Sequence, residues 1–184
     1  MPHWSLLVEK HTLQYEYTAL STPDTFSGSV FSGVCVCVCV CDDRQISHYC
    51  NEEQDWKKSE IWRDVPELHE SRDWFLHQLY LLSNCTNSKC SELHVLQRRA
   101  GCEVEKLPDG TIKNPKGFDE YQYDGEDFIV FNFNTTQWIN KNPKAKETKL
   151  KWDSQTIRNQ IIKDELKNCM NWISTFNNTQ RKEL

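Results

Sequence analysis

The stretch HTLQYEYTAL, residues 11–20, decides the fold class because its side chains alternate in character. Apolar or aromatic residues occupy every second position, and the positions between them are mostly polar. Such alternation predicts a β-strand with one face in a core and the other in solvent. A second alternating stretch at Val34–Cys41 and a short one at Ile46–Cys50 predict two further strands. The first half of the chain is therefore expected to begin as an antiparallel meander.

Two amphipathic patterns predict helices, one after each group of strands. The first lies between Pro66 and Ser83, and the second is clearest where apolar residues recur from Ile162 to Phe176. Between them, His94–Gly101 predicts one strand, and Gly117–Phe133 predicts two strands around a turn. Strands followed by a helix, twice over, favour an α+β fold with both helices on one face of an antiparallel sheet. Two helices placed in this way would enclose a groove.

Length and charge limit the class of protein. The chain has 184 residues and a formal net charge of -5, which suits one packed core and offers no basic field for nucleic acid. No stretch approaches the roughly 20 apolar residues needed to cross a bilayer. We expect residues 1–10 to be a leader remnant or disordered. Residues 11–92 would then form the first half-platform and residues 93–184 the second.

Cysteines and glycan acceptor tripeptides both favour an oxidising, secretory compartment. The nine cysteines are an odd number, so at least one is free or pairs with another chain. Three tripeptides fit the acceptor pattern, beginning at Asn84, Asn134 and Asn177. Asn84 is the predicted glycosylation site.

Seven short motifs follow one another along the chain. They read HTLQYEYTA at 11–19, CDDRQ at 41–45, QRRAGC at 97–102, FDEYQYDGEDF at 118–128, TQW at 136–138, KLKWD at 149–153 and CMNW at 169–172. In this order they resemble the membrane-distal platform of major histocompatibility complex (MHC) class I heavy chains, and the run Tyr123–Phe128 resembles bony-fish members. The resemblance spans about residues 11 to 184. It is weakest from Ile46 to Glu92, where the first helical region is shorter than in the family.

The resemblance implies a sheet of about eight strands, two long helices around a groove, and a disulfide between Cys102 and Cys169. A bridge of that length would stabilise the fold by roughly 4 kcal/mol in the chain-entropy model. In the family, the groove displays a peptide to T cells, and the resemblance implies the same function for this chain. The residues expected to bind a ligand by resemblance are Tyr15, Tyr17, Arg98, Thr148, Lys151, Trp152 and Phe176.

Part of this set suits a carboxylate, because Lys151 supplies positive charge while Thr148 and the Trp152 indole supply hydrogen-bond donors. Three positions depart from the peptide-presenting pattern. Asp164 and Phe176 each stand where presenting members carry a tyrosine, and Leu82 stands where a tyrosine or arginine helps to bind the carboxylate. A non-presenting molecule that binds a lipid or an immune receptor directly is therefore the alternative to peptide display.

Further partners follow from the same resemblance. The light chain beta-2-microglobulin is expected to contact Gln97, Gly125 and Asp127, although Glu16 places a carboxylate where presenting members are apolar. A T-cell or natural-killer-type receptor is expected on the helical surface. The full-length protein would lie on the extracellular face of the plasma membrane after passage through the endoplasmic reticulum, with its anchor outside this chain.

The cysteines at 35, 37, 39 and 41 allow two interpretations. Alternation puts them on one strand face, where thiols could bind a soft metal in a small secreted protein. Alternating Val and Cys is also what a repeated GT tract encodes, and this explanation is favoured. The pairing of Cys50, Cys85 and Cys90 stays open. No cofactor is expected, and no spacing predicts an oriented nucleophile and base, so an enzyme is not expected.

Overall fold

A computed structural model describes most of the second half of the chain and parts of the first. The described residues are 8–21, 33–41, 44–49, 56–58, 66, 68, 72–84 and 92–175. For residues 33–41, 44–49, 56–58, 72 and 73 the description covers the backbone and not the side chains. The predictions for Phe176, Cys50, Cys85, Cys90 and Asn177 lie outside these ranges.

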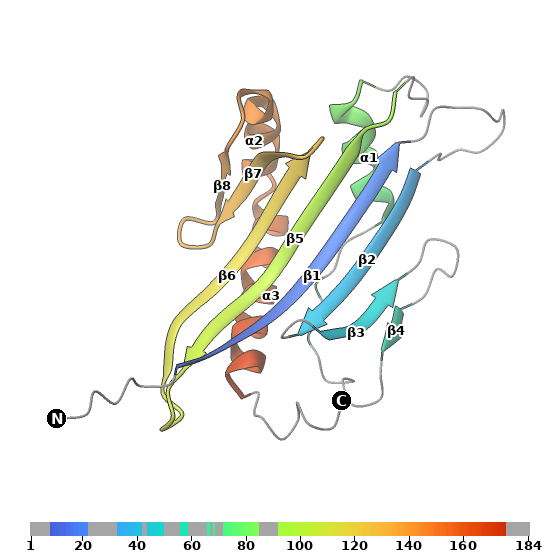
Figure 1. Ribbon diagram of the computed structural model, residues 1–184. Helices are drawn as coiled ribbons and strands as arrows, with labels where there is room; N and C mark the ends of the chain where they lie inside the picture. Colours follow the sequence, from blue (N-terminus) through green and yellow to red (C-terminus); the bar gives the residue numbers. More distant parts are fainter. Residues whose placement is uncertain are drawn as a thin grey trace.

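The strands form one antiparallel sheet, of order β4-β3-β2-β1-β5-β6-β7-β8 (Figure 1). Their bounds are β1 Glu9–Ser21, β2 Gly33–Cys41, β3 Arg44–Tyr49, β4 Trp56–Lys58, β5 Val95–Lys106, β6 Ile112–Tyr123, β7 Glu126–Asn132 and β8 Gln137–Asn140. The first strands of the two halves, β1 and β5, pair with each other at the centre. Each half therefore builds its strands outward from a shared seam.

Several strand bounds differ from the prediction. β1 begins at Glu9, so assigning residues 1–10 to a leader remnant or disorder was wrong for Glu9 and Lys10, which pair with Lys106 and Glu105 of β5. The β5–β6 hairpin is longer than expected. Backbone pairing continues to Lys106 and Ile112, where apolar and polar side chains no longer alternate regularly. The short strands β4 and β8 were missed, since three or four residues carry too little pattern to detect.

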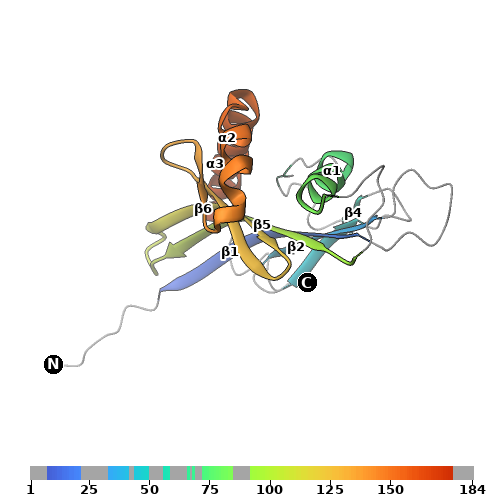
Figure 2. The same ribbon diagram turned by 90° about the horizontal axis from the view of Figure 1, so that it is seen from above.

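Helices cover one face of the sheet (Figure 2). They are α1 at Arg72–Leu82, α2 at Lys146–Asp153 after a short 3₁₀ turn at Pro143–Ala145, and α3 at Thr156–Thr175. The α+β prediction, with helices on one face of an antiparallel sheet, is confirmed. The closing helical segment is two helices instead of one, and α1 has only 11 residues, so it is not a long helix.

The break between α2 and α3 is held by buried polar contacts. The side chain of Asn159 on α3 donates to the Trp152 carbonyl at 2.9 Å and accepts from the Trp138 indole nitrogen at 3.0 Å. Asp153 accepts the Trp138 backbone N–H at 2.7 Å. The Trp152 carbonyl near the end of α2, which also accepts the Gln155 backbone N–H at 3.1 Å, thus gains another donor.

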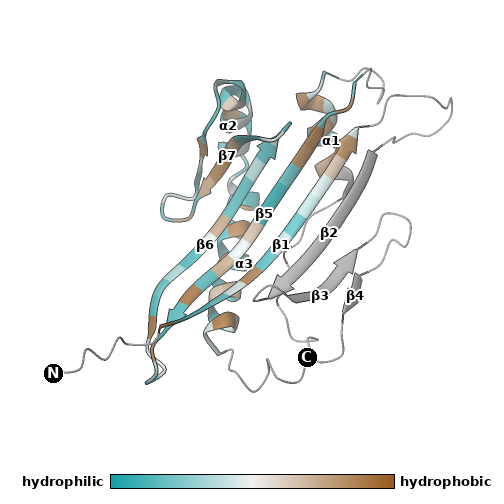
Figure 3. Cartoon of the chain, viewed as in Figure 1, coloured by the Kyte–Doolittle hydropathy of each residue, from teal (hydrophilic) through white to brown (hydrophobic). Residues whose placement is uncertain are grey.

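The hydrophobic core lies between the sheet and the helices. Apolar and polar residues alternate along β5 as bands in Figure 3, and the apolar members are buried. On α3 the buried positions recur at helical spacing, at Asn159, Ile162, Leu166, Cys169 and Ile173. Among the described residues, no helix combines the length and the apolar character that crossing a bilayer requires.

Candidate functional site

The helix-facing side of β1 and β5 carries three of the predicted ligand-binding residues. Tyr15, Tyr17 and Arg98 are all almost completely buried. The Tyr17 hydroxyl donates to the Leu68 carbonyl at 3.2 Å, which ties the sheet to the segment before α1. These three side chains are therefore part of the packed interior, beneath the helices.

Arg98 is held by a buried carboxylate. Its Nε lies 2.8 Å from Asp119 Oδ1 and its Nη2 lies 2.7 Å from Asp119 Oδ2, a bidentate pair. The guanidinium carbon also stands 5.1 Å from the ring centre of Tyr17 and 5.7 Å from that of Tyr121. Asp119 was not foreseen as a site residue, although it lies in one of the resembling motifs. The charge of Arg98 is thus already compensated within the protein.

The Thr148, Lys151 and Trp152 set on α2 does not converge. Thr148 and Trp152 are buried on the same side of the helix, one turn apart. Lys151 is exposed, and its Nζ lies 3.7 Å from Glu147 Oε1. In this arrangement the threonine and tryptophan face the interior, while the lysine faces solvent.

Side chains bridge α1 to the opposite helical wall. The Trp74 ring lies 5.6 Å from the Trp152 ring between centroids, and the Trp152 indole nitrogen lies 3.4 Å from Gln78 Oε1. The Arg158 guanidinium at the start of α3 stacks over Trp74 at 3.7 Å. Sequence reasoning missed Trp74, Gln78 and Arg158, because contacts between two helices leave no signal in the spacing of either one.

Beneath this bridge, aromatic rings continue to the sheet. Phe75 of α1 lies 6.1 Å from Tyr17 and 6.3 Å from Tyr121, and Tyr121 lies 4.9 Å from Trp152. Trp138 of β8 packs edge-on against Trp152 at 4.9 Å. Tilted and edge-on pairs at these distances are favourable beyond their buried area. The space between α1 and α2 is therefore occupied by side chains from both helices and the floor.

Two of the departures from the peptide-presenting pattern fall on described residues. Asp164 is exposed on α3 and accepts a hydrogen bond from Gln160 Nε2 at 2.9 Å, one turn earlier. Leu82 is half-buried at the end of α1. Asp164 is thus directed toward solvent and its own helix.

The end of α1 is joined to the sheet by polar contacts. Ser83 Oγ lies 3.0 Å from the Tyr123 hydroxyl, and His94, stacked on Tyr123, places Nδ1 2.8 Å from Asp124 Oδ2. Burial raises the pKa of Tyr123, as does the nearby Asp124 charge, while the Ser83 hydrogen bond lowers it. The adjacent Asn84 is exposed, as a glycan acceptor must be.

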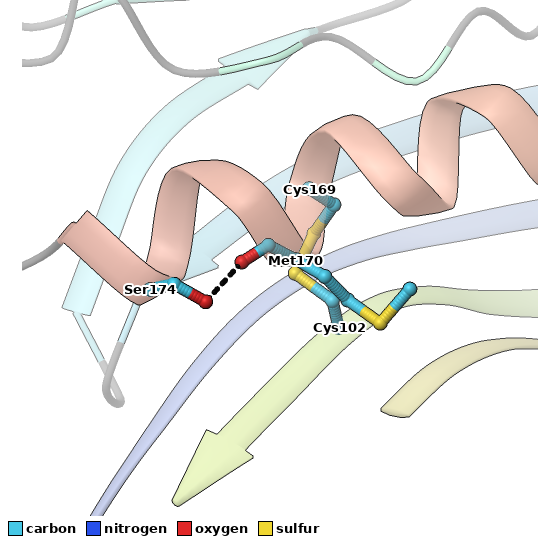
Figure 4. Close-up of a disulfide and its surroundings, with 4 residues drawn as sticks. All are labelled: Cys102, Cys169, Met170 and Ser174. Atoms are coloured by element: carbon cyan, nitrogen blue, oxygen red, sulfur yellow. Dashed lines mark hydrogen bonds between the residues drawn. A yellow bond between two sulfur atoms is a disulfide. The ribbon is translucent and has the colours of Figure 1, made fainter. Parts of the chain in front are cut away.

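The disulfide is present. Cys102 on β5 and Cys169 on α3 are bonded across a Cα–Cα distance of 5.8 Å (Figure 4). Both residues are fully buried, with Met170 and Ser174 beside them on the helix. Gly101 allows β1 to approach at this point, because a Cβ there would lie 2.0 Å from the Leu13 carbonyl oxygen. The bridge fastens α3 to the centre of the sheet.

The other face of the sheet is polar. Gln97, Gly125 and Asp127, the predicted light-chain contacts, are all exposed, and Gln122 Nε2 donates to Asp127 Oδ1 at 3.2 Å. Glu16 is exposed as well and accepts a hydrogen bond from Gln14. A shallow depression of about 210 Å³ lies among these strands, lined by Glu16, Tyr17, Thr18, Gln97, Arg98, Arg99, Glu120 and Gln122. On this exposed surface the Glu16 side chain stays hydrated, so it does not meet the cost of burying a polar group.

The cysteine-rich strand is described by its backbone alone. Cys35, Cys37, Cys39 and Cys41 stand opposite Ala19, Tyr17, Tyr15 and Leu13 of β1. Within the described part of the chain, no group of three or more His, Cys, Asp or Glu residues is arranged to hold a metal ion. The side chains of these four cysteines lie outside the described part of the chain, so the thiol hypothesis stays a prediction.

Comparison with known proteins identifies the family. Residues 9–184 match the description "Class I Histocompatibility antigen, domains alpha 1 and 2". Major histocompatibility complex class I-related protein 1 of Mus musculus is 39% identical over 87 residues, covering 47% of this chain and 24% of that protein. Zinc-alpha-2-glycoprotein of Homo sapiens is 33% identical over 105 residues, covering 56% of this chain and 33% of that protein.

A longer alignment is with MHC class I-like protein MILL1 of Mus musculus, 25% identical over 168 residues, which covers 88% of this chain and 41% of that protein. The chain thus spans less than half the length of these three relatives. The family match agrees with the structure, which has an antiparallel sheet under helices and a disulfide from β5 to α3. This chain belongs to the MHC class I family, as a class I-like alpha 1 and alpha 2 platform.

Proposed function

We propose that this chain is an immune recognition platform whose helical surface is read by a T-cell or natural-killer-type receptor, and whose groove is closed at the α1–α2 end. The contact between Trp74 and Trp152 carries the proposal. With Arg158 stacked over Trp74 and Tyr121 packed against Trp152, this contact fills the space between α1 and α2 at one end of the proposed groove. We therefore favour a molecule that does not hold a peptide at both of its ends.

The energetics support closure. A ligand reaching the floor here would have to displace the half-buried Trp74 or the buried Trp152, and truncating a buried tryptophan such as Trp152 typically costs about 3–5 kcal/mol. Lys151, the cation expected to meet a peptide carboxylate, is exposed and lies near Glu147. A carboxylate would gain little from a solvated lysine whose charge is already partly compensated.

Display of a peptide is the second candidate. It is favoured by Tyr15, which matches one tyrosine of the set that holds a peptide end in presenting relatives and which is buried on β1 with Tyr17. A groove open only at the far end would hold a ligand by one terminus. A lipid fits the same description, because its chain needs an apolar space and a single polar anchor.

Mass spectrometry of material eluted from the assembled, secreted protein tests the proposal. We expect no set of peptides with a shared length and shared terminal residues. Such a set from the wild-type protein would overturn closure. Trp74→Ala should open the end and increase the amount of bound small molecules, while Leu81→Ala, on the exposed face of the same helix, should not.

Beta-2-microglobulin is the proposed light chain, docked on the polar face. The exposed positions of Gln97, Gly125 and Asp127 support this assignment. Asp127→Lys should reduce co-purification of the light chain, whereas Asn140→Lys, exposed on the edge strand β8, should leave it unchanged. Equal recovery of the light chain with both variants would contradict this docking face.

The setting is proposed on the same basis. Recognition without catalysis, at the extracellular face of the plasma membrane in the full-length protein, agrees with the family and with the disulfide. A surface-labelling measurement on cells expressing the full-length protein would test it. Retention of the labelled protein inside the cell would contradict this location.

A further inference from the structure

The β7–β8 turn carries a second glycan acceptor tripeptide, Asn134-Thr135-Thr136, besides the one that begins at Asn84. It lies in residues 133–136, between β7 and β8, in a loop that projects from the side of the molecule (Figure 1). Asn134 and Thr135 are exposed, and Thr136 is half-buried. We propose that Asn134 is an N-glycosylation site, modified by an oligosaccharide in the secretory pathway.

The turn leaves the Asn134 side chain available. Asn132 Oδ1 accepts the backbone N–H groups of Asn134 at 3.0 Å and of Thr135 at 3.2 Å, so Asn132 and not Asn134 organises the turn. The Asn134 amide makes no hydrogen bond to any residue that the structure describes. By contrast, Asn114, Asn132, Asn142 and Asn159 all use their side chains in hydrogen bonds.

The tripeptide has the chemistry that the transfer needs. An Asn followed two residues later by Ser or Thr, with no proline between, is the acceptor pattern. The donor is an oligosaccharide linked to a lipid diphosphate. The Asn134 amide nitrogen forms a bond to C1 of the sugar and gives up one proton, while the bond from C1 to the diphosphate oxygen breaks and lipid diphosphate leaves with the electron pair.

The position gives the oligosaccharide a physical role. β8 is an edge strand, at the end of the sheet order, and Ile139 on it is 40% exposed. Exposed edges with apolar side chains invite pairing with other chains. A glycan at the β7–β8 turn would cover this edge. The predicted light-chain contacts Gly125 and Asp127 lie at the opposite end of β7. A glycan on Asn134 would therefore leave the light-chain surface free.

Site mapping tests the assignment. The protein is secreted from glycosylating animal cells and treated with peptide-N-glycosidase, and the peptide containing residue 134 is examined by mass spectrometry. We expect conversion of Asn134 to aspartate by the enzyme, which marks a former glycan. An unmodified Asn134 in secreted, disulfide-bonded protein overturns the proposal, whatever is found at Asn84.

Matched variants separate modification from folding. Asn134→Gln and Thr136→Ala should each lose the mass of one glycan on a gel, while Thr135→Ala, in the same turn, should keep it. Thr136→Ser should also keep it, which controls for the 3.3 Å contact from Lys163 Nζ to the Thr136 hydroxyl. The unglycosylated variants should form more soluble oligomers in size-exclusion chromatography. Equal oligomer content in Asn134→Gln and Thr135→Ala would show that shielding of the edge is wrong.

Discussion

Two arginine–carboxylate pairs on the same two strands show how different the faces of the sheet are. Arg98 and Asp119 lie on the helix-facing side, with side chains 1% and 0% exposed and a separation of 2.7 Å. One residue along each strand, Arg99 and Glu120 lie on the other side, 44% and 40% exposed and 3.7 Å apart. Both pairs join an arginine of β5 to a carboxylate of β6, but they lie on opposite faces of the sheet.

Burial decides how much an ion pair contributes to the stability of the fold. In water, two exposed side chains gain little, because solvent screens them and ordering them costs entropy. In the interior, each charge has given up its hydration, so removal of one partner leaves the other uncompensated. Breaking the helix-facing pair by removing one partner should therefore be costly, whereas the solvent-facing pair contributes little to stability.

The largest expected effect comes from removing the disulfide that fastens α3 to the helix-facing side of the sheet. Cys102→Ala combined with Cys169→Ala should lower the free energy of unfolding by roughly 4 kcal/mol, because the unfolded chain regains its loop entropy. Denaturant unfolding measures this directly. The wild-type protein under reducing conditions should lose at least as much stability as the double variant, because reduction breaks this bond together with any other disulfide. A loss below about 1 kcal/mol would mean that the disulfide adds little to the packing that holds α3.

Removing the buried charge should come next. Asp119→Asn keeps the size of the side chain but leaves the Arg98 guanidinium without its counter-charge, at an expected cost of about 3 kcal/mol. The double variant Arg98→Met with Asp119→Leu should recover much of this loss, since apolar residues can replace a buried pair. If Asp119→Asn unfolds at the same denaturant concentration as the wild type, the distinction between the faces fails.

A substitution where β1 pairs with β5 should destabilise the centre of the sheet. Gly101→Ala places a Cβ 2.0 Å from the Leu13 carbonyl oxygen, so the backbone of β1 or β5 must shift, at about 2 kcal/mol. Gly110→Ala is a control for backbone strain without a clash, because its φ of +87° also disfavours a Cβ while nothing lies within 4 Å of one. The melting temperatures of the two variants should differ clearly. Equal melting temperatures would show that the strands accommodate the methyl group.

The smallest effect is expected on the polar face. Glu120→Gln should cost less than about 1 kcal/mol, and the cost should shrink further at high salt. Asp119→Asn serves as the matched comparison, one residue away on the same strand. A double-mutant cycle with Arg99→Gln measures the coupling. Coupling as large as that of Arg98 and Asp119 would contradict the view that exposure weakens the pair.

The sequence predicted the parts of the fold that leave a periodic or linear signal. The alternation in β1, the helical spacing of α3 and the cysteines of the disulfide were all detectable, and the motif order pointed to the family. β8, the break after α2 and the Asp119 carboxylate under Arg98 were not, because each depends on contacts between distant segments. The bridge from Trp74 to Trp152 belongs to this second kind. The bony-fish resemblance and the ligand-binding roles stay predictions.

The pairing of β1 with β5, which runs from Glu9↔Lys106 to Leu20↔Val95, has a consequence for how the molecule is assembled. Each half contributes a flank of the sheet, and the second half is also closed covalently within itself by its disulfide. In terms of association, the two halves resemble the subunits of a heterodimer joined in one chain, and a covalent connection raises the effective concentration of each half for the other. Fragments separated between residues 84 and 92 should therefore find each other and reassemble across that seam.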